Sequence, residues 1–359
     1  MRTATGGIEM SKLAVVFAFA FATGVVQAQP AATTPPPTPT GPAPTGLVVG
    51  SGNFYSPIVA NLEDAIAFYR AVGFEFQGEP ANADANLPLR QMFGLPDAKL
   101  RYQIGRAPGI PGGVEIIEIS GAGGQRLGLK VQDPGTVLLQ VVVRDLDAAI
   151  ARLKAVKAPV ATRTGDVAAI PENGLRSILV QDPAGHFIRL VQPANAGAAQ
   201  AATGDIRGIR VRHTVENLDR ALALYRDALG LQAGRAPSAD YSTNAAIVDS
   251  FGLPEGTQWR LAQLTVPTSG VAVELIEFKG ARRGPPPDLA DPGATRIQLR
   301  VADIDAAAAA IVKAGGAFIS TGGKPLDLPA GNGTLKVGVV RDPDGYFLVL
   351  INSPPPAAR

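Results

Sequence analysis

The sequence has no cysteine, and among its 359 residues it has only two histidines and one tryptophan. Without cysteine the chain forms no disulfide, offers no thiolate nucleophile or cysteine ligand for zinc, and has no attachment point for a lipoprotein anchor. Two histidines leave little material for general-base chemistry or metal ligation. These shortages exclude most of the common catalytic and metal-binding arrangements.

The charges are also nearly balanced, with 33 Lys and Arg against 31 Asp and Glu and a net charge of +2. A chain without an excess of one sign has no field that gathers nucleic acid, so we expect no nucleic-acid partner. Hydrophobic residues make up 46% and charged residues 18%, which is typical of globular protein. At about 150 residues per domain, the length predicts roughly two domains.

The N-terminal region has the features of a secretory signal. An apolar run from Leu13 to Val26 follows Lys12 and leads to a small-x-small sequence ending at Ala28. The run has 14 residues, fewer than the roughly 20 that cross a bilayer, so no permanent membrane span is expected. We therefore predict a cleaved signal peptide over residues 1–28 and a periplasmic or secreted location.

A proline-rich stretch over residues 29–46 follows, and its composition predicts an extended tether. Two methionines, Met1 and Met10, are both compatible with the start of translation, and the signal pattern does not choose between them.

The rest of the chain is an internal repeat. NLEDAIAFYR at Asn61 returns as NLDRALALYR at Asn217, and FGLP, VE[IL]IE, D[LI]DAA and DP-x-G segments recur in the same order at offsets of 156 to 160. The repeat predicts one domain over residues 47–195 and a second over residues 205–353. Residues 196–204 would be the linker and residues 354–359 a tail.

Each repeat itself divides into two similar parts, in which a strand leads to a helix and then to further strands. The helices are expected after residues able to cap a helix N-terminus: Asn61, Asp145, Asn217 and Asp303. The strands alternate, as in residues 296–301, where Ile297, Leu299 and Val301 share one face. This pattern predicts an α+β protein built from four similar modules.

These motifs, in this order and in both copies, resemble the vicinal oxygen chelate (VOC) family, which includes glyoxalase, bleomycin-resistance and extradiol dioxygenase proteins. The resemblance covers nearly all of residues 47–195 and 205–353. It implies tandem VOC-type domains, each with two βαβββ modules forming an open β-cup around one site. It also implies that family enzymes hold a divalent metal with His and Glu side chains on the first and last strands of the modules.

At those metal positions this chain keeps only two residues of a ligand type, Glu115 and Glu274. The other six positions carry Phe54, Leu138, Arg189, Arg210, Arg296 and Val349. Apolar side chains have no lone pair, and a guanidinium repels a divalent cation. We therefore predict no cofactor, and a divalent metal held by an atypical ligand set is the less favoured alternative.

The polar residues that remain suggest other binding chemistry. In copy two, the predicted inner face carries Arg210, Arg212, Glu274, Arg296, Gln298 and Arg300, a set suited to a carboxylate or phosphate. An equally weighted interpretation makes them ordinary solvent-facing strand residues. In copy one, Phe54, Leu138 and Val142 would surround Glu115, Gln140 and Arg189, with an ion pair between Glu115 and Arg189.

The remaining conspicuous residues are interpreted as structural. Alternation places His213 on the strand face opposite Arg210, so we expect a partly buried histidine, and His186 is expected at the surface of a turn. Tyr69 and Tyr225 fall at core positions of their helices. The two FGLP segments are expected to be turns at the rim of the cups, where they would be able to cover a ligand.

The leading hypothesis is an exported protein that binds a small, anionic or neutral organic molecule without metal chemistry. The candidate ligand-binding residues are Gln140, Arg189, Arg210, Arg212, Glu274, Arg296, Gln298 and Arg300. The alternative is a metal-dependent lyase, isomerase or dioxygenase of the family, with Glu115 and Glu274 as catalytic candidates. A third hypothesis is an interaction scaffold that self-associates through its sheet edges.

Overall fold

The computed structural model describes residues 45–52, 55–171, 173–194, 204–235, 237, 239–330 and 333–352. The predicted signal peptide, the tether up to residue 44, residues 195–203 of the linker region, Phe54 and the tail lie outside these residues. Among the described residues, no helix combines the length and the hydropathy needed to cross a membrane.

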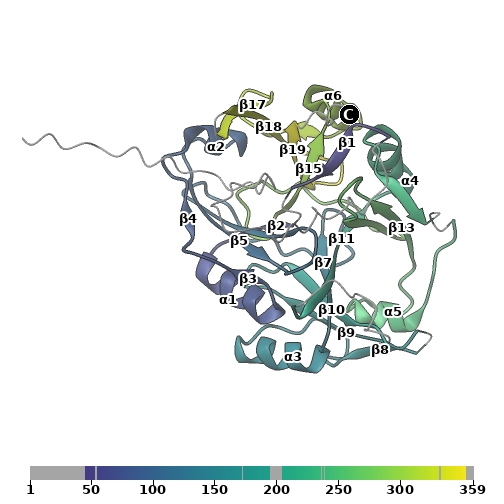
Figure 1. The fold of residues 1–359 in the computed structure, drawn as a ribbon. Helices are drawn as coiled ribbons and strands as arrows, with labels where there is room; N and C mark the ends of the chain where they lie inside the picture. Colours follow the sequence, from purple (N-terminus) through teal and green to yellow (C-terminus); the bar gives the residue numbers. More distant parts are fainter. Residues whose placement is uncertain are drawn as a thin grey trace, which may run out of the picture.

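Four modules follow one another along the chain (Figure 1). Module 1 comprises β1 (Val48–Ser51), β2 (Ser56–Val59), α1 (Leu62–Val72), β3 (Glu75–Phe76), β4 (Ala81–Asn82), α2 (Leu87–Met92), β5 (Lys99–Arg106) and β6 (Gly113–Ser120). Module 2 comprises β7 (Val137–Val143), α3 (Leu146–Ala155), β8 (Ala168–Ile170), β9 (Leu175–Gln181) and β10 (Phe187–Gln192).

The second half repeats this order. Module 3 comprises β11 (Ile206–Val215), α4 (Leu218–Leu222), the π-helical turn η2 (Ala223–Ala228), β12 (Gln232–Arg235), α5 (Ala245–Ser250), β13 (Trp259–Thr265) and β14 (Ala272–Phe278). Module 4 comprises β15 (Thr295–Val301), α6 (Ile304–Lys313), β16 (Ala317–Phe318), β17 (Leu326–Ala330), β18 (Gly333–Arg341) and β19 (Phe347–Asn352).

The strands form two mixed sheets, and each sheet combines one module from each half of the chain. Modules 1 and 4 give the order β16-β18-β19-β15-β2-β6-β5-β3, and modules 2 and 3 give β12-β13-β14-β11-β7-β10-β9-β8. The halves are joined where β15 pairs with β1 and β2 and where β11 pairs with β7, in each case antiparallel. The predicted α+β class with paired modules is confirmed.

The pairing of modules differs from the expectation that each copy closes its own cup. Every module offers the same open edge on its first strand, and pairing across the copies satisfies the same backbone hydrogen bonds as pairing within a copy. We call the face of the sheet from modules 1 and 4 that carries Glu115 cup 1, and the face of the sheet from modules 2 and 3 that carries Glu274 cup 2. The residues that the sequence predicts for one cup are therefore divided between the two cups.

The four predicted caps are confirmed. In each case the side-chain oxygen accepts a hydrogen bond from the backbone N–H three residues further on, over 2.8 to 3.0 Å. The capping residues are Asn61, Asp145, Asn217 and Asp303. Each module therefore starts its main helix at the residue that the sequence indicates.

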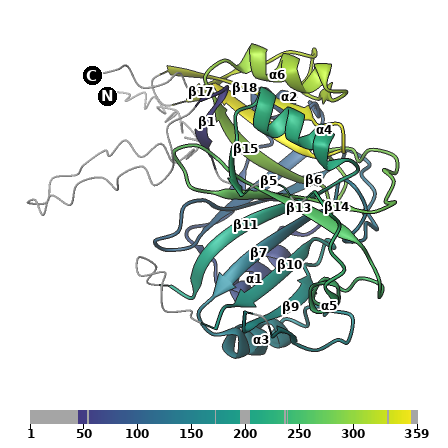
Figure 2. The same ribbon diagram turned by 90° about the vertical axis from the view of Figure 1, so that its right-hand side faces the viewer.

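One large apolar core joins both sheets and the four main helices. On β15, Ile297, Leu299 and Val301 enter this core, while Arg296 and Gln298 lie on the opposite face. Figure 2 shows α3 at one end of the molecule and α4 and α6 at the other, with the strands between them. Two smaller apolar clusters lie in the cups, one in each.

Both histidines are buried at the junctions between modules. The expectation of a surface position for His186 is wrong, because its ring nitrogens lie 2.8 Å from Asp182 Oδ2 and 3.0 Å from the carbonyl oxygen of Ala294. His213 is also fully buried and enters the core side of β11, away from the cup. Neither histidine is placed to act in a cup.

The two FGLP segments bring glycines close to the backbone of the opposite half. Gly94 and Gly252 both have positive φ, at 71° and 65°. A Cβ at Gly94 would overlap the carbonyl oxygen of Ile319, and a Cβ at Gly252 would overlap that of Ala161. Only glycine allows both the backbone conformation and the close approach.

We expect Gly252→Ala to lower the free energy of unfolding by about 2 to 3 kcal/mol, because strain in the left-handed region adds to the clash with Ala161. Gly280→Ala is the matched control, since Gly280 has a φ of 80° but a Cβ added there would have no described atom within 4 Å. It should cost only about 1 kcal/mol. Urea unfolding of both variants measures the difference, and equal losses would contradict the role assigned to the close approach.

Candidate functional site

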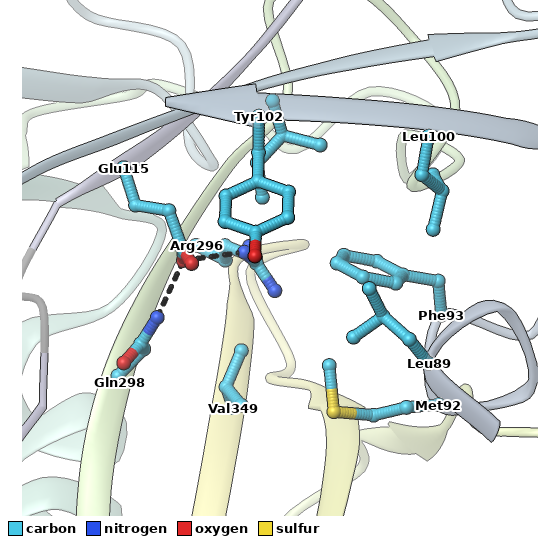
Figure 3. A pocket seen from close by; sticks show the side chains of 10 residues that line it. Leu89, Met92, Phe93, Leu100, Tyr102, Glu115, Arg296, Gln298 and Val349 are labelled. Atoms are coloured by element: carbon cyan, nitrogen blue, oxygen red, sulfur yellow. Dashed lines mark hydrogen bonds and ion pairs between the residues drawn. The ribbon is translucent and has the colours of Figure 1, made fainter. Parts of the chain in front are cut away.

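Cup 1 contains a pocket between the short helix α2 and the strands β5, β6, β15 and β19 (Figure 3). Its volume is about 350 Å³, including the part open to solvent. The lining is apolar at the α2 side, and the sheet contributes all the polar residues together with some apolar ones: Leu89, Met92, Phe93, Leu100, Tyr102, Glu115, Ile117, Arg296, Gln298 and Val349. This division gives the pocket an apolar body and one polar end.

Glu115 is the centre of the polar end. Its Oε2 accepts hydrogen bonds from Arg296 Nη2 at 2.7 Å, Gln298 Nε2 at 2.5 Å and Ser56 Oγ at 3.2 Å. The strand register creates this arrangement, because Ser56 lies directly opposite Arg296 in the antiparallel β2–β15 pair and β6 runs parallel to β2. All three of these contacts fall on one carboxylate oxygen, and Glu115 is only 5% exposed.

Arg296 and Tyr102 set the electrostatics of this pocket. Burial lowers the pKa of the Arg296 guanidinium, and the charge of Glu115 opposes that shift. Arg296 Nε is buried and has no hydrogen-bond partner among the described residues, and the guanidinium lies 4.5 Å from the centre of the Phe93 ring. Burial, with a contribution from Glu115, raises the pKa of Tyr102 to about 12, so its hydroxyl stays protonated at neutral pH.

In cup 2 the corresponding glutamate, Glu274, binds two arginines. Arg212 donates to Glu274 Oε2 from Nη2 at 2.6 Å and from Nε at 3.0 Å, and Arg210 donates to Oε1 at 3.1 Å. Burial acts to raise the pKa of Glu274, but the two guanidinium groups hold it below its usual range. The Glu274 carboxylate is therefore ionised and occupied by its neighbours.

Arg189 also lies in cup 2, so the predicted ion pair between Glu115 and Arg189 is wrong. The exchange of module partners puts Arg296 beside Glu115 instead. Arg189 donates to Gln140 Oε1, Ser177 Oγ and Ser250 Oγ over 3.0 to 3.1 Å. Burial, together with the nearby charge of Arg212, lowers its pKa to about 9, which leaves the side chain charged at neutral pH.

The structure therefore divides the predicted site residues between the cups. Glu115, Arg296 and Gln298 lie in cup 1, while Gln140, Arg189, Arg210, Arg212 and Glu274 lie in cup 2. Arg300 is half-buried further along β15, opposite Gly50 of β1, and does not line the cup 1 pocket. The interpretation of Arg296 and Gln298 as solvent-facing is wrong, since they are 2% and 1% exposed.

The two FGLP segments are turns, as expected, and they follow the short helices α2 and α5. Sequence reasoning did not predict that Phe93 and Phe251 are each 2% exposed and pack inside the cups. Ser56, Tyr102 and Ser250 were also not identified. The repetition of FGLP at equivalent places in both copies was the available signal, because an aromatic residue kept at one position of a repeat has the same surroundings in both.

These residues do not fit a divalent metal of the family type. Each cup offers one glutamate, and that carboxylate already lies 2.7 Å or 2.6 Å from an arginine. Leu138 and Val349 supply no lone pair at two of the other positions. Within the part of the chain that the structure describes, no three His, Asp or Glu side chains are grouped so that they could hold a metal ion.

Comparison with known proteins agrees with this architecture. The family model for the Glyoxalase/Bleomycin resistance protein/Dioxygenase superfamily matches residues 210–350. The fold is similar to glyoxalase I from Zea mays, with 14% identity and a TM-score of 0.52 over 86% of this chain and 92% of that one. A glyoxalase family protein from Bacillus cereus is 20% identical, with a TM-score of 0.34 over 38% of this chain and 90% of that one.

The match to the family model and the two sheets of paired modules define a tandem α+β protein of the VOC type. Residues 210–350 belong to the glyoxalase, bleomycin resistance and dioxygenase superfamily. The fold of the whole described chain is that of glyoxalase I. No match was found among curated protein sequences.

Proposed function

We propose that this protein binds a small organic molecule in the cup 1 pocket without a family-type metal centre. The observation that carries the proposal is the buried set of Glu115, Arg296 and Gln298 at one end of an apolar pocket. Polar groups at the end of an apolar cavity fix the orientation of a ligand, and the apolar walls supply most of its contact area.

The chemistry of the polar end indicates the class of ligand. Arg296 has a buried Nε–H without a hydrogen-bond partner among the described residues, so it favours a ligand with an acceptor oxygen. Glu115 and Arg296 neutralise one another, which allows either a neutral carbonyl compound or a carboxylate. The apolar side, with Leu89, Met92 and Phe93, suits a compact aromatic or branched aliphatic body.

We propose export as part of the same function. The apolar run behind Lys12, the cleavage-type sequence at Ala28 and the proline-rich stretch that follows support a mature protein that begins at residue 29. The alternative, a lyase, isomerase or dioxygenase with an atypical metal set, draws no support from the donor atoms in either cup.

We expect phenylacetamide and phenylacetate to raise the midpoint of thermal unfolding and to bind with measurable heat in isothermal titration calorimetry. Each has an aromatic body and an oxygen that Arg296 is able to bind. Phenethylamine has the same body but no acceptor, so it should not bind. Leu89→Phe, which fills the apolar end of the pocket, should weaken binding of phenylacetamide about tenfold or more.

Arg210→Met is the matched control, because Arg210 lies in cup 2 and its side chain is 42% exposed. This variant should bind phenylacetamide like the unaltered protein. Binding of phenethylamine as strong as that of phenylacetamide, or an unchanged affinity in Leu89→Phe, would contradict the assignment of the ligand to this pocket.

A further inference from the structure

The positive charge of cup 2 exceeds its negative charge. Arg210 and Arg212 share Glu274, whereas the three hydrogen-bond partners of Arg189 among the described residues are neutral oxygens. Arg189 is nevertheless 4% exposed. A buried guanidinium normally has a carboxylate or another anion beside it, because burial removes the water that would otherwise solvate the charge.

The place that an anion would take is covered by an aromatic ring. The guanidinium groups of Arg189 and Arg212 lie 4.4 Å and 4.3 Å from the centre of the Phe251 ring. The negative face of an aromatic ring attracts a cation, but less strongly than an ionised oxygen does. Arg189 Nε is also buried and lacks a hydrogen-bond partner among the described residues, so one donor in this site stays unused.

We propose that cup 2 binds a small oxyanion, a carboxylate or phosphate group, between Arg189 and Arg212 when the Phe251 ring moves off these arginines. Two guanidinium forks offer the paired N–H donors that such groups bind. Arg210, whose side chain is 42% exposed, connects the site with solvent and adds a third positive group at its entrance. This site differs from the cup 1 pocket in both place and chemistry.

The cover is a small segment. Phe251 follows α5, a helix of six residues. The segment is tied to module 2 by the Asp249–Arg163 ion pair at 2.9 Å, by the hydrogen bond from Arg189 to Ser250 and by the close approach of Gly252 to Ala161. Arg163 is 48% exposed, and exposed ion pairs contribute little to stability. Release of the ring therefore requires no change in the sheet that carries the arginines.

The single tryptophan of the chain reports on this cup. Trp259 lies on β13 and packs against the apolar cluster that contains Phe251 and Val248. We expect inorganic phosphate and malonate, titrated into the full-length protein at constant ionic strength, to change the Trp259 fluorescence in a saturable way. Sodium chloride serves as the reference salt. A response to phosphate alone or to malonate alone identifies which oxyanion class the site prefers.

Phe251→Ala should bind the same anions about fivefold more tightly or better, because the ring no longer competes for the arginines. Arg189→Met should abolish the saturable response while circular dichroism shows an intact fold. Leu89→Phe, which alters only cup 1, should leave the phosphate titration unchanged and so separates this site from the proposed function. A response equal to that of sodium chloride in both the unaltered protein and Phe251→Ala would overturn the proposal.

Discussion

Replacing Glu115 with leucine is expected to lower the free energy of unfolding by about 3 to 5 kcal/mol, because Arg296 would then remain buried without its charged partner. The guanidinium is 2% exposed, so water is not able to replace the lost carboxylate. The hydrogen bonds of Gln298 and Ser56 to Glu115 are lost at the same time. Urea unfolding at neutral pH measures the loss.

The double variant Glu115→Leu/Arg296→Met should recover most of this stability, since well-packed apolar residues often replace a buried ion pair at little cost. Glu63→Gln provides the matched control. Glu63 also pairs with an arginine, Arg101, but its side chain is 59% exposed, and its loss should cost less than about 1 kcal/mol. A double variant as unstable as Glu115→Leu alone would show that the loss does not come from an unpaired Arg296.

The features that sequence reasoning predicted correctly are local ones. A cap depends on one side chain and the next three backbone amides, and a strand face depends on alternation within a few residues. Asn61 and Asp303 could therefore be identified as caps, and Ile297 and Leu299 assigned to the core face, without knowledge of the partner strands. Such local rules do not predict which modules pair with one another.

The partner of each module could not be predicted from charge. Pairing within copies would have put Arg189 with Glu115, and Arg296 with Arg210 and Glu274. Pairing across copies exchanges Arg189 and Arg296. At the family positions, cup 1 then contains Glu115 and Arg296, and cup 2 contains Glu274, Arg189 and Arg210. Both arrangements therefore have the same charges at these positions, and electrostatic complementarity does not distinguish them.

The short helices that enter the cups escaped prediction for a different reason. α2 and α5 have six residues each, too few to show a helical repeat of apolar positions. Their position is fixed instead by contacts with the other half, such as Gly94 against Ile319 and Gly252 against Ala161. Those contacts exist only after the modules have paired, so the repeated FGLP sequence marks Phe93 and Phe251 as equivalent but does not show that they lie inside the cups.

The two DP-x-G turns contain equivalent aspartates with opposite electrostatics. Both ring nitrogens of His186 face acceptor oxygens, Asp182 Oδ2 and the Ala294 carbonyl, so the ring is doubly protonated and forms a buried ion pair. Burial opposes this charge separation, but each partner overcomes it for the other. The pKa of Asp182 is held below its usual value and the pKa of His186 is raised.

Asp342 has no such partner. Tyr225 donates a hydrogen bond of 2.7 Å to it, but His213 Nδ1 is 3.7 Å away, and neither ring nitrogen of His213 forms a hydrogen bond among the described residues. Burial raises the pKa of Asp342, against the smaller opposing effect of His213. The native state therefore favours the neutral acid at this position and the ionised acid at Asp182.

We expect Asp182→Asn to lower the free energy of unfolding by about 3 to 5 kcal/mol at pH 6, and Asp342→Asn by about 1 kcal/mol or less. The lowered pKa of Asp182 gives stability above its unfolded value that is lost as the pH falls through the native pKa. The raised pKa of His186 gives stability below its unfolded value that is lost as the pH rises through the native pKa. The ion pair thus stabilises the fold most fully between about pH 4 and pH 6.5.

Urea unfolding from pH 5 to pH 9 separates the two aspartates. The cost of Asp182→Asn should shrink toward high pH, where the unaltered protein loses the charge of His186. Asp342→Asn should instead gain stability relative to the unaltered protein as the pH rises, because the amide avoids ionising a buried acid whose pKa is raised. Parallel pH profiles for the two variants would mean that the turns have the same electrostatics. The contrast would then have to be abandoned, together with the inference that His186 is charged.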